Sequence, residues 1–125
     1  MQRHQAPFRA DIVGSFLRPD AIKQARQQLA AGAIDAQQLR QIENEAIRHL
    51  VQQQCECGLH VVTDGEFRRA WWHFDFFDGL QGVERYDSEK GIQFNGVQTK
   101  AHGVRVTGKL AFGDHPMLED FRYLK

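Results

Sequence analysis

The spacing of apolar residues predicts a short helix over residues 20–31. Its apolar positions recur at intervals of three and four, which places them on one helical face. They are Ile22, Ala25, Leu29 and Ala30. Pro19 suits the first position of a helix, and Gly32 suits a C-terminal stop. The segment is therefore predicted to be a short amphipathic helix.

A longer helix is predicted to follow and to end at about Glu56. Asp35 and Gln38 have the spacing of a capping box at its start. One continuous apolar stripe then runs along it, formed by Leu39, Ile42, Ala46, Ile47, Leu50 and Val51. Gly58 lies where a left-handed C-terminal cap is needed.

Three segments have the composition of β-strands: residues 11–16, 59–63 and 104–110. The first two are separated by the predicted helices, and parallel strands are connected by helical crossovers of this kind. The chain is therefore predicted to be α/β, with a parallel sheet to which residues 104–110 add a third strand.

The remaining segments carry weaker patterns. Residues 67–80 are rich in aromatic side chains and are predicted to be helical, and residues 81–102 contain glycines and short β-like pieces typical of a hairpin excursion. Asp114 is predicted to cap a last helix that begins at Pro116.

Composition and charge narrow the possible functions. The chain has 125 residues, 16 basic and 16 acidic side chains and a pI of about 7.0, which gives no electrostatic reason to expect a nucleic acid or an anionic membrane as partner. No apolar run approaches the roughly 20 residues that span a bilayer, and the first residues lack the apolar core of a secretory signal. We therefore expect one cytoplasmic domain over residues 1–125.

Acidic and basic side chains crowd the end of the second predicted strand. Gly65 permits a sharp turn that leaves Asp64 and Glu66 facing a small polar molecule, where a carboxylate could bind an ammonium group or hold a nearby arginine. The alternative is an ordinary Asp-Gly turn with solvated charges. Val13, Gly14 and Ser15 form the corresponding loop after the first predicted strand. They could donate to a carboxylate or phosphate, or form only a tight turn into the helix.

Two further groups of residues invite chemical interpretations. Cys55, Cys57 and His60 offer zinc-ligand chemistry, but positions 55 and 57 lie about 200° apart around a helix and no second Cys/His pair follows at finger spacing. We therefore expect two helix-end thiols, one of them buried, and no zinc site. The run Trp71-Trp72-His73-Phe74 could pack as a core wedge or stack on a flat heteroaromatic ligand.

Residues 11–19, 58–73 and 94–99 together resemble the start of the catalytic barrel of cobalamin-independent methionine synthases, above all the short, single-barrel members. The combination of Val-Gly-Ser-Phe at 13–16 with Thr-Asp-Gly-Glu at 63–66 carries the resemblance. A complete (β/α)8 barrel takes about 250 residues. The resemblance therefore implies the N-terminal portion of a TIM barrel, about three strands, with a β-hairpin excursion.

The resemblance also implies an activity, namely transfer of the methyl group of 5-methyltetrahydrofolate to the zinc-bound thiol of homocysteine. In this interpretation Val13, Gly14 and Ser15 contact the carboxylate of homocysteine, and Glu66, beside Asp64, binds its ammonium group. Trp72 and Arg105 are the implied folate contacts. The family's zinc ligands lie beyond the region that matches this chain, so no metal is expected for these residues alone.

Other functions stay open. The chain could serve a methyl or alkyl transferase for another thiol such as coenzyme M, a decarboxylase-like barrel without zinc, or a non-catalytic module that pairs with another chain. Parallel strands are normally buried on both faces, so an incomplete barrel should self-associate or require a complementary C-terminal segment. Ser15 and Glu66 are expected to lie within about 10 Å of each other, since adjacent parallel strands present their C-terminal loops together.

Overall fold

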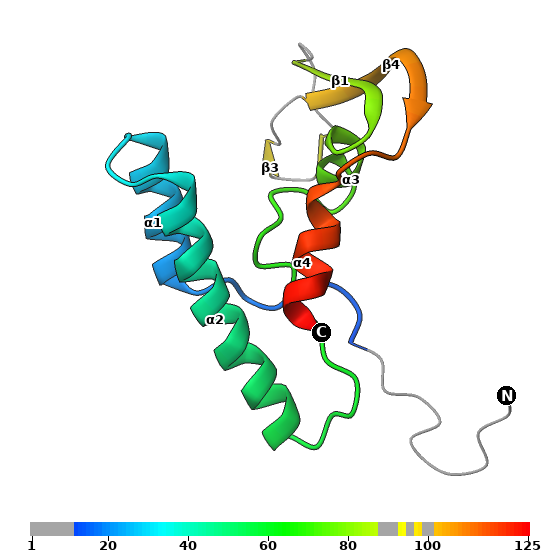
Figure 1. Ribbon diagram of the computed structural model, residues 1–125. Coiled ribbons are helices and arrows are strands. Elements are labelled where there is room, and N and C mark those ends of the chain that lie inside the picture. The colour runs from blue at the N-terminus through cyan, green and yellow to red at the C-terminus, as the bar shows by residue number, and fades with distance from the viewer. Residues whose placement is uncertain (1–11, 88–92, 95–96, 99–101) are drawn as a thin grey trace, which may run out of the picture. The chain divides into compact units, whose positions relative to one another are not determined.

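The computed structural model describes residues 12–87, 93–94, 97–98 and 102–125 (Figure 1). The chain divides into two compact units, Met1–Arg68 and Arg69–Lys125. Both helices and β-strands are present, so the broad α/β class is confirmed, but the paired strands are antiparallel.

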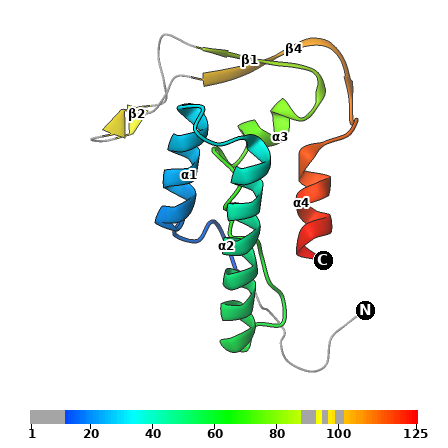
Figure 2. The same ribbon diagram turned by 60° about the vertical axis from the view of Figure 1, so that its left-hand side comes forward.

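The first unit is built on a pair of helices, α1 (Asp20–Ala30) and α2 (Ala36–Glu56), which lie side by side in both views (Figures 1 and 2). Its core contains Ile22 and Ala25 of α1, Ile47 and Leu50 of α2, and Phe67. The predicted capping box is confirmed, because Asp35 Oδ1 accepts from Gln38 N at 2.7 Å and Gln38 Oε1 accepts from Asp35 N at 2.9 Å.

The predicted ends of both helices are also confirmed. Gly32 and Gly58 follow α1 and α2 with φ of 71° and 83°, in the left-handed region that terminates helices. Local spacing and capping chemistry were sufficient to locate both elements.

The two strands predicted in this unit are wrong. Residues 12–16 and 59–63 are irregular, and only residue 11 of the first segment lies outside the described part of the chain. Their backbone groups bond to other partners: Phe16 N donates to Gly65 O at 3.2 Å, and Thr63 N donates to the Gln54 side chain at 3.0 Å. A strand requires a ladder partner, and the described residues of this unit supply none.

The second unit contains a two-stranded antiparallel sheet of β1 (Gln81–Asp87) and β4 (His102–Ala111). The expected third strand therefore exists, but its predicted parallel pairing is wrong. The register shifts between Gln81 and Val83, where Gly82 has φ of 78° and where an added Cβ would lie 2.6 Å from Lys109 O. A glycine bulge thus bends β1.

The predicted hairpin excursion is confirmed in part. The short strands β2 (Gln93–Phe94) and β3 (Val97–Gln98) pair antiparallel, and the rest of residues 88–101 lies outside the described residues. The longer aromatic helix predicted over residues 67–80 is reduced to α3 (Phe74–Asp78), which packs against β1 and β4.

The last helix, α4 (Pro116–Leu124), is present, but its predicted cap is wrong. His115, not Asp114, is the capping residue, because its Nδ1 accepts from Met117 N at 3.2 Å. His115 Nε2 lies 2.8 Å from Phe76 O, so the imidazole is the tautomer that donates from Nε2 and links α4 to α3. Across the described ranges, no helix combines the length and apolar character needed to cross a membrane.

Candidate substrate-binding loops

The turn at residues 63–67 is held by the end of α2. Gln54 is buried, its Nε2 donates to Thr63 O at 2.8 Å, and its Oε1 accepts from Thr63 N at 3.0 Å. Both backbone groups of Thr63 are therefore satisfied by one side chain, as a strand neighbour would satisfy them. This pairing holds the start of the turn, at Thr63, against α2.

The turn itself uses the carboxylate of Asp64. Its Oδ1 accepts from Glu66 N at 3.0 Å, while Gly65 N donates to Thr63 Oγ1 at 2.9 Å. These are Asx- and ST-type turns, so the Asp-Gly turn considered from the sequence is present. Asp64 shapes the turn, and its predicted contact with a substrate stays a prediction.

Two successive residues of the turn are left-handed, Gly65 with φ of 67° and Glu66 with φ of 59°. Glutamate adopts this conformation at a cost that glycine does not have. Such strained residues persist where the surroundings determine the backbone closely, and they are frequent at functional sites.

The two predicted site loops meet in the structure. Phe16 N, one residue after Ser15, donates to Gly65 O, one residue before Glu66, at 3.2 Å. Val13, Gly14 and Ser15 are exposed, and Gly14 has φ of 85°. The expectation that the loops at 14–15 and 64–66 lie side by side is confirmed, although no parallel strand leads into either.

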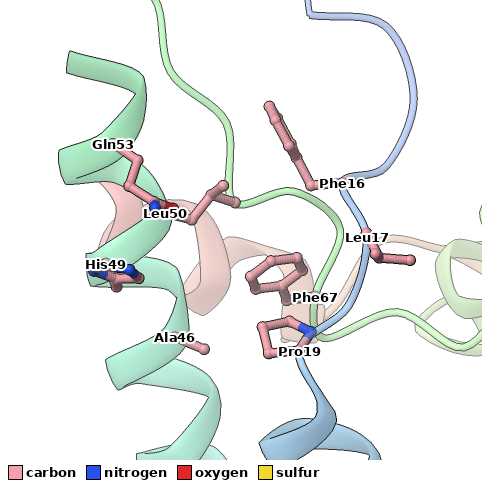
Figure 3. Close-up of a pocket in the computed structure, with 8 residues that line it drawn as sticks. All are labelled: Phe16, Leu17, Pro19, Ala46, His49, Leu50, Gln53 and Phe67. Atoms are coloured by element: carbon pink, nitrogen blue, oxygen red, sulfur yellow. The ribbon is translucent and has the colours of Figure 1, made fainter. Parts of the chain in front are cut away.

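A small pocket of about 200 Å³ lies beside these loops (Figure 3). Its lining is mainly apolar and comes from the segment between the first loop and α1, from α2 and from Phe67. The lining residues are Phe16, Leu17, Pro19, Ala46, His49, Leu50, Gln53 and Phe67. The site thus combines a polar turn with an adjacent apolar depression.

A charged network that the sequence analysis missed supports the same turn. Buried Glu43 lies 3.3 Å from Arg68 and 3.5 Å from Arg26, and Arg26 donates to Phe67 O at 2.8 Å. Arg18 donates to Glu66 O and to Phe67 O, each at 3.3 Å. A signal was present in the sequence, since Glu43 and Gln54 continue the helical spacing of Ile47 and Leu50, and all four are buried.

The implied folate contacts belong to the second unit. Trp72 is 70% exposed, with its indole tilted against His73 at a centroid distance of 4.1 Å. Arg105 on β4 pairs across the sheet with Glu84 at 3.1 Å. The ring centroids of Trp71 and Phe74 lie 5.7 Å apart, so this aromatic run packs on itself while Trp72 stays accessible.

Zinc-ligand chemistry is not assembled here. Among the described residues, no three His, Cys, Asp or Glu side chains lie where they could hold a metal ion. Both Cys55 and Cys57 are exposed, so the expectation that one is buried is wrong. Cys55 lies in the last turn of α2 and Cys57 caps the helix, both beyond the last buried position at Gln54.

Comparison with known proteins places this arrangement in a family. Residues 8–107 match the model for the cobalamin-independent synthase catalytic domain. The chain belongs to this family. The match contains both loops that meet at Gly65 as well as Trp72 and Arg105, and it confirms the resemblance to cobalamin-independent methionine synthases.

Relatives of this synthase-family chain are considerably longer. It is 60% identical over 124 residues to the uncharacterized protein YxjG of Bacillus subtilis, covering 99% of this chain and 33% of that protein. It is 26% identical over 114 residues to the methionine synthase of Sulfolobus acidocaldarius, covering 91% of this chain and 32% of that protein. The chain therefore spans about a third of the length of these curated relatives.

A solved structure shows the same relationship. A Listeria monocytogenes protein, assigned provisionally as a vitamin-B12-independent methionine synthase, is similar with a TM-score of 0.75 and 45% identity. The similarity covers 98% of this chain and 33% of that protein. The fold described here is thus similar to one part of a longer synthase-family structure.

Proposed function

We propose that this chain provides the amino-acid-binding part of a methionine-synthase-like methyltransferase, within the N-terminal portion of a TIM barrel. The reaction is transfer of a methyl group from 5-methyltetrahydrofolate to the thiol of homocysteine. The observation that carries the proposal is the hydrogen bond from Phe16 N to Gly65 O, which brings two family motifs together.

The chemistry of the two loops suits the two charges of an amino acid. Ser15 and the backbone N–H groups around Gly14 are donors for a carboxylate, and both residues are exposed. Glu66 supplies a carboxylate for the ammonium group, and Asp64 adds negative charge beside it. Substrate orientation is therefore the role proposed for Val13, Gly14, Ser15, Asp64 and Glu66.

The folate is proposed to meet Trp72 and Arg105. An exposed indole suits stacking on a flat pterin, and a guanidinium suits an anionic group of the folate substrate. The pairing of Arg105 with Glu84 is exposed, so a folate carboxylate could compete for the guanidinium.

Zinc, when bound in this family, lowers the pKa of the substrate thiol. The described residues of this chain do not fit a zinc site. The proposed task of these residues is to bind and orient substrate in a cytoplasmic enzyme, alone or with a complementary C-terminal segment.

Calorimetric titration with homocysteine tests the proposal. Homocysteine should bind, and Glu66→Gln should weaken binding about tenfold, because a charge-assisted contact is lost. Glu45→Gln, an exposed change on α2, should leave binding unchanged. Coenzyme M has no ammonium group. If it binds tightly, and if its affinity is the same in Glu66→Gln, the alternative thiol substrate is favoured.

A further inference from the structure

We propose that Glu43 is a positioning residue, which acts through Arg26 and Arg68 to hold the backbone of the turn that carries Asp64 and Glu66. Its importance for substrate rests on the proposed function, but its structural action does not. Together with Asn44, to which Arg68 donates, Glu43, Arg26 and Arg68 form the Glu43 cluster.

Burial is the first step of the argument. The Glu43 side chain is 8% exposed and the Arg68 side chain is 6% exposed, so both charges have been removed from water. Such a pair is seldom gained for stability alone, because desolvation offsets most of the attraction. A specific geometric role is the better explanation for its presence.

The contacts of the cluster show what that geometry fixes. Arg68 donates to Glu43 at 3.3 Å and to Asn44 at 2.5 Å, which anchors the residue after Phe67 to α2. Arg26 is within 3.5 Å of Glu43 and donates to Phe67 O at 2.8 Å, which attaches the same turn to α1. Glu43 therefore orients two guanidinium groups, of which one bonds Phe67 O at the end of the turn and the other belongs to the next residue, Arg68.

The turn has reason to need this support. Glu66 is left-handed although it is not glycine, and the carbonyl of the next residue, Phe67, is the one that Arg26 of the Glu43 cluster holds at 2.8 Å. Without the network the backbone would relax toward an ordinary conformation, and the side chains of Asp64 and Glu66 would change direction. Helix α2 thus contributes to the loop geometry through a buried charge, in addition to the Gln54 hydrogen bonds and the packing of Leu50.

Amide hydrogen exchange separates positioning from general stability. In Glu43→Gln the amides of Gly65, Glu66 and Phe67 should exchange about tenfold faster relative to those of Ile47 and Leu50 in α2. A merely structural role would accelerate both sets equally. Glu45→Gln on the same helix, at an exposed position, is the matched control and should change neither set.

A second variant keeps the test decisive if Glu43→Gln does not fold. Arg26→Gln removes the donor to Phe67 O from a side chain that is 26% exposed, and it should give the same selective acceleration. Its control is Lys23→Gln, which removes only an exposed pair with Asp20. Equal acceleration of turn and helix amides, or none, in the variant that folds would overturn the inference.

Homocysteine binding tests whether the geometry of the turn matters for substrate. If homocysteine binds, Glu43→Gln should raise its dissociation constant about tenfold, as the turn loses its geometry. If the unmodified chain binds no homocysteine, the proposed function fails while the exchange result still decides the role of Glu43. If homocysteine binds equally well to Glu43→Gln, the positioning role is wrong.

Discussion

At the scale of single residues, Gly65 is the most constrained position of the site. It has φ of 67°, and an added Cβ would lie 2.5 Å from Leu50 Cδ2, 3.1 Å from Phe67 and 3.3 Å from Phe16. Leu50 and Phe67 are buried, so a methyl group at this position would have to displace core side chains. Glycine is therefore required both for its backbone conformation and for its lack of a side chain.

Gly65→Ala should strongly destabilise the first unit. The left-handed backbone costs alanine about 1–2 kcal/mol, and forcing a methyl group against Leu50 adds about 1–3 kcal/mol. Urea unfolding followed by helical circular dichroism measures the change in free energy.

Gly58→Ala provides the control, because Gly58 has φ of 83° but nothing within 4 Å of an added Cβ. In Gly58→Ala the free energy of unfolding should fall only by the cost of a left-handed alanine, about 1–2 kcal/mol. If both substitutions lower the free energy of unfolding equally, the close packing around Gly65 does not contribute to stability.

The same residues show what sequence reasoning can reach. An Asp-Gly pair predicts a turn from local chemistry, and the turn at Asp64 is present. The partners of Glu43 could not be found in this way, because Arg26 and Arg68 are 17 and 25 residues distant along the chain. A charge on an apolar helical face indicates a buried partner without identifying it.

At the scale of elements, the two long helices α1 and α2 were predictable, whereas two of the three predicted strands and the pairing direction of the third were not. Capping by Asp35 and termination at Gly58 depend on neighbours within a few residues. Residues 59–63 have strand composition, but their conformation depends on a ladder partner elsewhere in the chain. Gln54 takes that partner's place at Thr63, so the segment stays irregular. Pairing direction is equally non-local, which is why β4 was assigned to a parallel sheet.

Gln54→Ala tests the connection between α2 and the turn. It leaves the N–H and C=O of Thr63 without their side-chain partner in a partly buried place, so the unfolding free energy should fall by about 2–3 kcal/mol. Chemical denaturation measures this loss.

Gln52→Ala is the matched control for that substitution. Gln52 lies on the same helix but donates only to Glu56 at an exposed position, so its loss should cost less than about 0.5 kcal/mol. A similar loss in the two variants would mean that Gln54 contributes helix propensity rather than the contact with Thr63.

At the scale of the whole molecule, the buried apolar residues are unevenly distributed. Every fully buried hydrophobic side chain among the described residues lies in the first unit. In the second unit, the described residue that is fully buried is His115, and large apolar side chains remain exposed there. These are Trp72, Phe76, Tyr86, Val106, Leu110, Phe112, Leu118 and Phe121. A two-stranded ribbon with so little core is marginal by itself.

This distribution predicts that the 125-residue chain self-associates or gains order from a complementary segment. Val106 and Phe112 are 65% and 58% exposed, and each removes apolar surface from water when covered. Sedimentation velocity at rising micromolar concentration should show oligomers, and replacing both residues with serine should shift the distribution toward monomer. Near-ultraviolet circular dichroism of that monomer should be weak, because no buried apolar residue in the described part of the second unit packs its aromatic rings into a core. A monodisperse unmodified monomer with a sharp aromatic signal and cooperative melting would contradict the prediction, since the exposed residues would then need no cover.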